Sequence, residues 1–247
     1  MKKILAIVLA LVLACGMTAL AETADVKGEG VMTYAEYAAA ELETEVTVET
    51  YVQAKQSWWN DQATLYTVDQ EGGYFLYNLP CTAEQYAQLV PGTKIKVTGY
   101  KTAWAGEVEI IDAKFEILEG SYIAEPTDVT AVLPAENLID YQNQYVAFKG
   151  MTVEACNDKG DAYQYNWDGS GEAGTDADLY FNASVDGQTY TFVIEYYMCD
   201  ANGVYGAETE AYKAVQALKV GDKIDMTGFL YWYEGAQPHI ASVAAAE

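Results

Sequence analysis

The stretch LVPGTKIKVTGY at Leu89–Tyr100 returns at Leu218–Phe229 as LKVGDKIDMTGF, at a constant offset of 129 residues. Six of the twelve positions are identical, including both glycines. Weaker similarity precedes each copy, because Thr44–Ala54 resembles Gln144–Ala155. Self-similarity at a fixed offset indicates that one structural unit is repeated. The chain is therefore predicted to contain two copies of one domain, the second lengthened mainly by residues 157–178.

The hydrophobic period predicts the same order of elements in both copies. Strands are expected at 46–52, 65–68, 74–77, 94–100 and 107–115, and again at 146–153, 179–183, 190–197, 224–230 and 239–243. One helix is expected between the third and fourth strands of each copy, beginning after Thr82 in the first and spanning 209–218 in the second. Thr82 and Gln85 have the spacing of a capping box. A further short helix is expected at 32–42, with Thr33 as its cap.

Strand, strand, strand, helix, strand, strand is the order of an OB-fold, a partly open five-stranded Greek-key barrel. At the repeated Leu-x-x-Gly-x-Lys-Ile stretch, the chain resembles the small OB-fold domains of exported bacterial proteins. The resemblance implies an all-β fold of two tandem OB-fold barrels, each with one short helix between strands 3 and 4. The first domain is expected at residues 31–120 and the second, with the insert, at 128–247, with Pro126 in the linker between them.

The N-terminus has the three parts of a secretory signal peptide at residues 1–21. Two lysines precede an apolar run at 4–13, and small residues lead to Ala21 before Glu22. Cleavage after Ala21 predicts a secreted or cell-surface protein, and no later segment is long and apolar enough to be a transmembrane helix. A lipid anchor at Cys15 is the less favoured alternative, because Leu13 fits the lipobox poorly.

The charge balance is strongly acidic. The chain has 37 acidic residues, 13 lysines and no arginine, for a formal net charge of -24, and loss of residues 1–21 removes two of the lysines. Such a chain repels a phosphate backbone and lacks the forked guanidinium that grips phosphate. Nucleic acid is therefore expected to be the least favoured partner, although Lys94, Lys96 and Lys101 cluster in the first copy.

Residue sets for catalysis are missing from the sequence. His239 is the single histidine and is expected to be a half-buried strand residue, and no Cys-x-x-Cys spacing occurs, so zinc and thiol redox chemistry have no ligand set. Beyond Cys15, Cys81, Cys156 and Cys199 allow at most one disulfide. Cys156 and Cys199 are expected either to pair or to remain buried thiols. We expect a protein that is not an enzyme.

All five tryptophans fall in two loop classes, after the first and after the fourth strand of a copy. OB-folds use these loops, together with the adjoining strand face, to hold oligonucleotides and oligosaccharides. An aromatic face stacks on a sugar ring without requiring positive charge. The candidate ligand-binding residues are Trp58, Trp59, Trp104, Trp167, Tyr231, Trp232 and Tyr233. The alternative interpretation is that these aromatic side chains close the barrel ends as lids.

The insert in the second copy crowds carboxylates among glycines, which is typical of extracellular calcium loops. The candidate metal ligands are Asp158, Asp161, Asp168, Glu172, Asp176 and Asp178. Their spacing does not match an EF-hand, so a solvated acidic loop is the alternative. Calcium is the one cofactor that the sequence indicates.

These features predict a non-enzymatic extracellular binding module, with a glycan as the expected ligand. Two other functions stay open. A protein-interaction or scaffold module of the cell envelope would use strand edges or tyrosine-rich faces. A nucleic-acid-binding OB-fold protein would use the same loops as the glycan binder, and it is the less favoured of the two.

Overall fold

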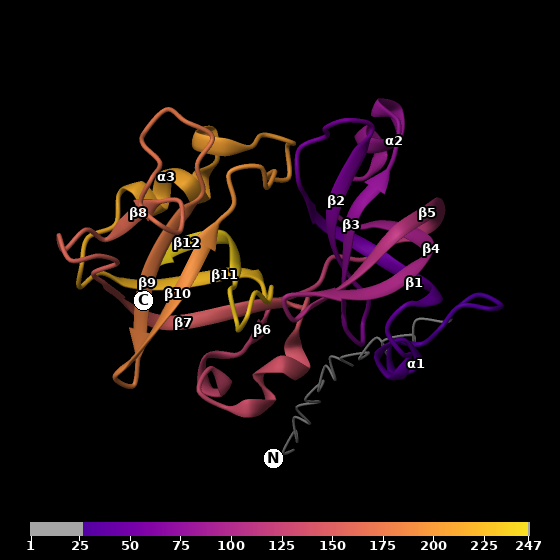
Figure 1. Ribbon diagram of the computed structural model, residues 1–247, viewed down its shortest axis with the longest axis horizontal. Coiled ribbons are helices and arrows are strands. Elements are labelled where there is room, and N and C mark those ends of the chain that lie inside the picture. Colours follow the sequence, from indigo (N-terminus) through magenta and orange to yellow (C-terminus); the bar gives the residue numbers. More distant parts are fainter. Residues whose placement is uncertain (1–26, 247) are drawn as a thin grey trace, which may run out of the picture.

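Two β-barrels make up most of the computed structural model, which describes residues 27–246 (Figure 1). The expected signal peptide and Cys15 lie outside the described residues. The strands of barrel one are β1 (Thr44–Lys55), β2 (Gln62–Val68), β3 (Gly73–Pro80), β4 (Thr93–Trp104) and β5 (Glu107–Ser121). They close in the order β1-β2-β3-β5-β4, with β4 pairing again to β1. Strands β3 and β5 run parallel, and the other neighbours run antiparallel.

Barrel two repeats this topology. Its strands are β7 (Tyr145–Glu154), β9 (Leu179–Val185), β10 (Gln188–Ile194), β11 (Lys223–Phe229) and β12 (His239–Ala245). The β7–β9 pairing closes the barrel, and β10 runs parallel to β12 as β3 does to β5. Two short strands extend its sheet, β6 (Thr127–Asp128) beside β7 and β8 (Tyr163–Tyr165) beside β9. The all-β prediction of two OB-fold barrels is therefore confirmed.

The repeated glycines explain why the segments Leu89–Tyr100 and Leu218–Phe229 determine the fold. Gly99 in β4 and Gly228 in β11 occupy the same position in the two barrels, and the strand register shifts beside each of them. A Cβ atom on Gly99 would lie 2.7 Å from the carbonyl oxygen of Ile111, and one on Gly228 would lie 2.2 Å from that of His239. Any side chain at these positions would push neighbouring strands apart, so glycine is needed where the barrel bends.

The helices are short and capped as predicted. The α-helices are α1 (Tyr34–Ala39), α2 (Ala83–Gln88) and α3 (Glu210–Gln216), and the 3-10 helices are η1 (Thr130–Val132), η2 (Glu136–Tyr141) and η3 (Gly206–Glu208). Thr82 and Gln85 form the expected capping box, and Thr33 with Glu36 forms another at α1, which is shorter than the expected 32–42. Within residues 27–246, no helix is long and apolar enough to cross a membrane.

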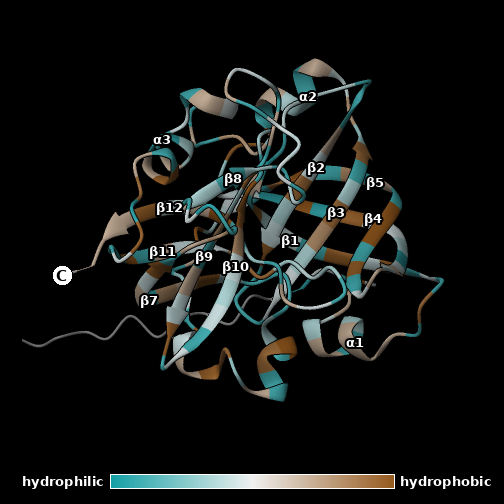
Figure 2. Ribbon diagram, turned by 60° about the vertical axis from the view of Figure 1, so that its left-hand side comes forward, coloured by the Kyte–Doolittle hydropathy of each residue, from teal (hydrophilic) through white to brown (hydrophobic). Residues whose placement is uncertain are grey.

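Each barrel has its own apolar core, which the alternation of inward and outward side chains builds. The strands carry alternating hydrophobic and hydrophilic bands (Figure 2). The core of barrel one includes Val48, Leu65, Leu76, Ile95 and Ile110, and that of barrel two includes Phe148, Phe181, Phe192, Met226 and Ile240. The helix α3 contributes Tyr212 and Val215 to the second core.

A third apolar cluster joins the two barrels. Tyr66 of β2 and Phe75 of β3 lie on the outer face of barrel one, where they pack against Phe229 and Met198 of barrel two. The rings of Tyr66 and Phe229 stack with centroids 4.6 Å apart. We call this contact region the barrel joint. It covers the β2–β3 face, which OB-folds commonly use for ligand binding, so barrel one offers that face to its neighbour instead.

Candidate functional site

The seven aromatic residues predicted to bind a ligand lie in separate places. Trp58 and Trp59 lie at one edge of the barrel joint. Trp104 and Tyr233 form an exposed pair from the two barrels, with ring centroids 5.1 Å apart. Trp167 lies apart in the insert and is 76% exposed. The remaining two, Tyr231 and Trp232, are half-buried in the joint. The structure therefore does not gather these residues into one surface.

One cavity of about 440 Å³ opens where the β1–β2 loop of barrel one meets two loops of barrel two. Trp58 and Trp59 line one side, with Trp59 69% exposed. Tyr197, Tyr205 and Asp176 line the other side. The lining is completed by Gln56, Ser57, Gln62, Ala63, Thr64 and Asn78. We call this cavity the aromatic cleft.

Hydrogen bonds fix two of the aromatic side chains of the cleft, Trp58 and Tyr197. The Ser57 amide donates to the carbonyl oxygen of Tyr197 at 2.8 Å, which joins the two barrels at the base of the cleft. The indole Nε1–H of Trp58 donates to the carbonyl oxygen of Cys81 at 3.0 Å. The Tyr197 hydroxyl donates to Asp176 Oδ2 at 2.8 Å. These contacts hold Trp58 and Tyr197 in place, so a ligand would meet two aromatic side chains that are already positioned.

The electrostatic character of the cleft is negative. Among its lining residues, Asp176 is the one acid, and no lysine is present. The hydrogen bond to this carboxylate is the main reason why the pKa of Tyr197 is raised. Ring faces carry partial negative charge, and a carboxylate beside them adds a full one. A cavity of this composition attracts a cation.

Lysines predicted to form a basic cluster in barrel one largely serve the fold. Lys101 is buried and donates to three backbone carbonyl oxygens at Tyr37, Ala38 and Ala40, at 2.8–2.9 Å. Burial lowers the pKa of this ammonium group. Lys94 forms an ion pair with Glu49 at 2.9 Å. Two of the three lysines of the predicted cluster, Lys94 and Lys101, are therefore engaged inside barrel one.

The second aromatic pair rests on contacts between the β4–β5 turn and the β11–β12 loop. The Glu234 amide donates to the carbonyl oxygen of Ala105 at 2.7 Å, next to the Trp104–Tyr233 pair. Two residues earlier, the Trp232 amide donates to Glu107 Oε2 at 2.8 Å. Trp232 is therefore part of the contact between the two barrels, and its ring is not freely exposed for ligand binding.

A buried polar group at the centre of the joint was missed by sequence reasoning. The Tyr66 hydroxyl donates to Glu195 Oε2 and lies 2.7 Å from His239 Nδ1. Gln56 Nε2 donates to the other carboxylate oxygen of Glu195 at 2.9 Å. Burial alone would raise the pKa of Glu195, but His239, Tyr66 and Gln56 together outweigh it and the pKa is lowered.

His239 is buried, which corrects the expectation of a half-buried strand residue. Its ring stacks on that of Tyr231, with centroids 4.2 Å apart. Tyr231, like Trp232, is thus committed to the joint. No sequence motif links Tyr66, Glu195 and His239, and the one available signal was a glutamate placed directly after the apolar residues Phe192–Ile194.

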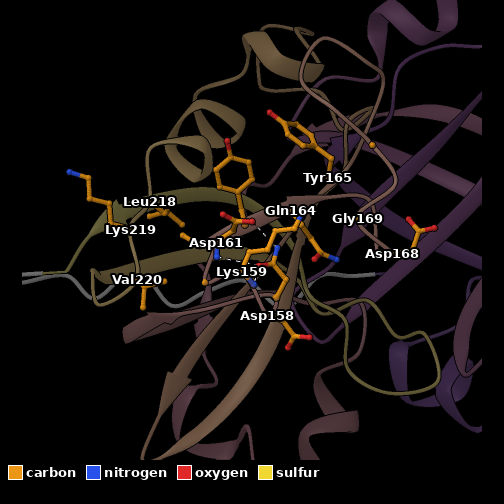
Figure 3. Close-up of a pocket in the computed structure, with 15 residues that line it drawn as sticks. Asp158, Lys159, Asp161, Gln164, Tyr165, Asp168, Gly169, Leu218, Lys219 and Val220 are labelled. Atoms are coloured by element: carbon orange, nitrogen blue, oxygen red, sulfur yellow. Dashed lines mark hydrogen bonds between the residues drawn. The ribbon is translucent and has the colours of Figure 1, made fainter.

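The predicted calcium ligands are not brought together. They are Asp158, Asp161, Asp168, Glu172, Asp176 and Asp178. The first three line a cavity of about 840 Å³ beside the insert, where their carboxylates point in different directions (Figure 3). Asp176 lines the aromatic cleft instead, and Asp178 accepts a hydrogen bond from the Tyr196 amide at 2.7 Å. Across residues 27–246, no three His, Cys, Asp or Glu side chains are grouped so that they could hold a metal ion.

The three cysteines of the described region are free thiols, so Cys156 and Cys199 are not joined. Cys81 and Cys199 are buried, and Cys156 is half-buried. Burial is the main reason why the pKa of each thiol is raised. Of the two alternatives for Cys156 and Cys199, the structure has the one without a disulfide.

Comparison with known proteins gives matches only among solved structures, since no protein-family model and no curated protein matches the chain. A murine DNA-binding protein bound with double-stranded DNA matches with 10% identity and a TM-score of 0.36, over 81% of this chain and 96% of the other. The p202 HIN1 domain in complex with a 12-mer double-stranded DNA matches with 11% identity and a TM-score of 0.36, over 83% and 91%. The Ifi202 HINa domain with a 20-base-pair DNA matches with 9% identity and a TM-score of 0.36, over 83% and 100%.

These findings correct the expectation of a glycan-binding module with nucleic acid as the least favoured partner. All three of these structures are described as proteins bound to double-stranded DNA. The structure adds a physical reason for barrel one, because barrel two covers its β2–β3 face. Glycan binding is therefore withdrawn.

Proposed function

We propose that the chain is a non-enzymatic binding module whose aromatic cleft takes a cationic side chain, lysine or arginine, from a partner protein. The observation that carries the proposal is the placement of the Asp176 carboxylate among Trp58, Trp59, Tyr197 and Tyr205 in one cavity. This is the protein-interaction alternative that the sequence left open, now assigned to particular side chains.

The chemistry of the cleft suits an ammonium or guanidinium group. A cation over an aromatic face gains about 0.5–1 kcal/mol at an exposed site and about 2 kcal/mol when it is desolvated. The carboxylate of Asp176 adds an ion pair, worth up to about 1 kcal/mol at an exposed position. The formal net charge of -24 would also draw a basic partner toward the surface and raise its association rate.

The test is a fluorescence titration of the protein with an oligolysine peptide and with the same peptide acetylated on every lysine. Acetylation keeps the length of the peptide and removes its charge. Asp176→Asn is expected to weaken binding of the unmodified peptide about fivefold, equivalent to about 1 kcal/mol. The amide keeps an oxygen that accepts from the Tyr197 hydroxyl, so the cleft should keep its shape.

Matched variants separate the cleft from the general acidity of the chain. Asp168→Asn removes an acid of the same insert that does not line the cleft, and Trp167→Ala removes an exposed tryptophan outside it. Both are expected to bind like the wild type, whereas Trp59→Ala is expected to bind more weakly. Equal losses for Asp176→Asn and Asp168→Asn would refute the proposed site.

The same titration is run with a double-stranded DNA. DNA binding that survives Asp176→Asn and Trp59→Ala, in the absence of any peptide binding, would replace the proposed function with nucleic-acid binding. Its salt dependence would then give the number of phosphates contacted.

A further inference from the structure

The aromatic cleft offers ring surface from both barrels to one ligand. Trp58 and Trp59 belong to the loop after β1, whereas Tyr197 and Tyr205 belong to the segment between β10 and α3. These side chains are 38–69% exposed, so part of each is open to a ligand. The rings of Tyr197 and Tyr205 have centroids 5.9 Å apart and planes inclined by 39°. Four rings and one carboxylate, that of Asp176, therefore line a single cavity.

The buried lysines of barrel one show what accompanies a primary ammonium group beside an aromatic ring in this protein. Lys101 Nζ lies 5.0 Å from the ring centroid of Tyr37 and donates to three backbone carbonyl oxygens at 2.8–2.9 Å. Lys55 Nζ lies 3.7 Å from the ring centroid of Tyr86 and donates to the carbonyl oxygen of the same residue at 2.8 Å. A primary ammonium group is compact and strongly hydrated, so it needs acceptors in place of its water as well as a ring.

The one charged acceptor of the cleft is already partly engaged. Asp176 Oδ2 accepts from the Tyr197 hydroxyl at 2.8 Å. Burial and a hydrogen bond to the same carboxylate raise the pKa of the Tyr196 hydroxyl. Asp176 therefore supplies negative charge, while part of its hydrogen-bonding capacity is taken. A trimethylammonium group suits such a site, because it has no N–H to satisfy and its methyl groups bring positive charge onto the ring faces.

We propose that the aromatic cleft is a cage for a trimethylammonium group, which it binds more tightly than a primary ammonium group. This inference rests on the proposed function, since it names the form of the cation that the same cleft takes. A trimethylated lysine side chain of a partner protein presents this group, and so does a free small molecule such as choline. The rings supply the cation–π contact, and the Asp176 carboxylate adds charge attraction.

The first experiment is an NMR titration of the full chain with ¹⁵N-labelled tryptophan. The ligands are choline, ammonium chloride and the neutral tert-butyl analogue of choline, which keeps its shape and lacks its charge. Choline is expected to shift the indole signals of Trp58 and Trp59 and to leave that of Trp167, outside the cleft, unchanged. It should bind about tenfold more tightly than either of the other two ligands. Small ligands with a single charge separate the cage from the general acidity of the chain.

A peptide titration identifies the source of the group. The oligolysine peptide that tests the proposed function is compared with the same peptide trimethylated on every lysine, since methylation keeps the charge. The trimethylated peptide is expected to bind about tenfold more tightly. Selectivity among the peptides alone would assign the group to a partner protein, and binding of choline alone would assign it to a free small molecule. Either result supports the cage.

Two variants complete the test. Tyr205→Leu removes one ring of the cage but keeps an apolar side chain, and Trp167→Leu is the matched control at an exposed position outside the cleft. The preference for the trimethylated peptide should fall about threefold in Tyr205→Leu and stay unchanged in Trp167→Leu. Equal affinity of the wild type for the two peptides, with no preference for choline over its neutral analogue, would overturn the cage and leave the proposed function standing. Absence of binding by every cation would overturn both.

Discussion

The raised pKa of Glu107 makes the stability of the protein depend on pH in a way that can be calculated. The ordinary pKa of this group is 4.5, and burial in the folded state raises it to about 8. Between these values the folded protein holds a proton that the unfolded chain has lost. The free energy of unfolding must then fall as pH rises, by about 1.4 kcal/mol per pH unit for one group. Over the whole window the loss is about 5 kcal/mol, and above pH 8 this group causes no further change.

Urea unfolding at a series of pH values measures this effect, and the difference between wild type and Glu107→Gln isolates it from other titrating groups. The variant carries no proton to lose, so its advantage over wild type should grow from pH 5 to pH 8 and then level off. Glu109→Gln serves as the control for loss of a neighbouring acid. A difference between wild type and Glu107→Gln that stays constant across this range, or shrinks as pH rises, would refute the assignment of a neutral buried Glu107.

Three further substitutions test the barrel joint. Tyr66→Phe keeps the stacked ring but removes the hydroxyl from Glu195 and His239, and it should cost about 1–3 kcal/mol of unfolding free energy in urea titrations; a cost within error of zero would show that the polar group is not needed. Phe229→Ala should cost about 3–5 kcal/mol, whereas Leu42→Ala at an exposed position should cost less than about 0.5 kcal/mol. Gly73→Ala would place a Cβ atom 2.1 Å from the carbonyl oxygen of Asn143, so the chain must shift; a melting temperature equal to wild type would contradict this packing.

Much of the fold could be predicted because it rests on local rules. Period-two alternation located the ten strands of the two barrels, and the Thr82–Gln85 spacing located α2. The repeated glycines Gly99 and Gly228 fixed the correspondence between the barrels, since both lie where strands approach too closely for a side chain.

The barrel joint could not be predicted, because it depends on which outward faces meet. Tyr66 and Phe75 point away from the core of barrel one, so alternation alone assigns them to the surface. In the structure both faces of β2 are buried, since Leu65–Val68 is buried throughout. A strand buried on both faces needs a second layer, which is barrel two in this protein. The position of Asp176 in the aromatic cleft could not be predicted either, because the cleft forms only where the two barrels meet. From the sequence alone, Asp176 was assigned to a calcium loop.

The two barrels share one topology but have different roles in the assembled chain. Barrel one gives its β2–β3 face to the joint, through Tyr66 and Phe75. The matching β9–β10 face of barrel two carries Asn182 and Thr191, whose side chains bond to each other at 2.8 Å, and Thr191 is exposed. Duplication therefore produced one barrel that serves as a packing partner and one that keeps its strand face open. Because the aromatic cleft needs Trp58 from the first barrel and Asp176 from the second, neither barrel alone would form it. A ligand of the cleft should accordingly stabilise the joint, whereas a ligand of the β9–β10 face should stabilise barrel two only.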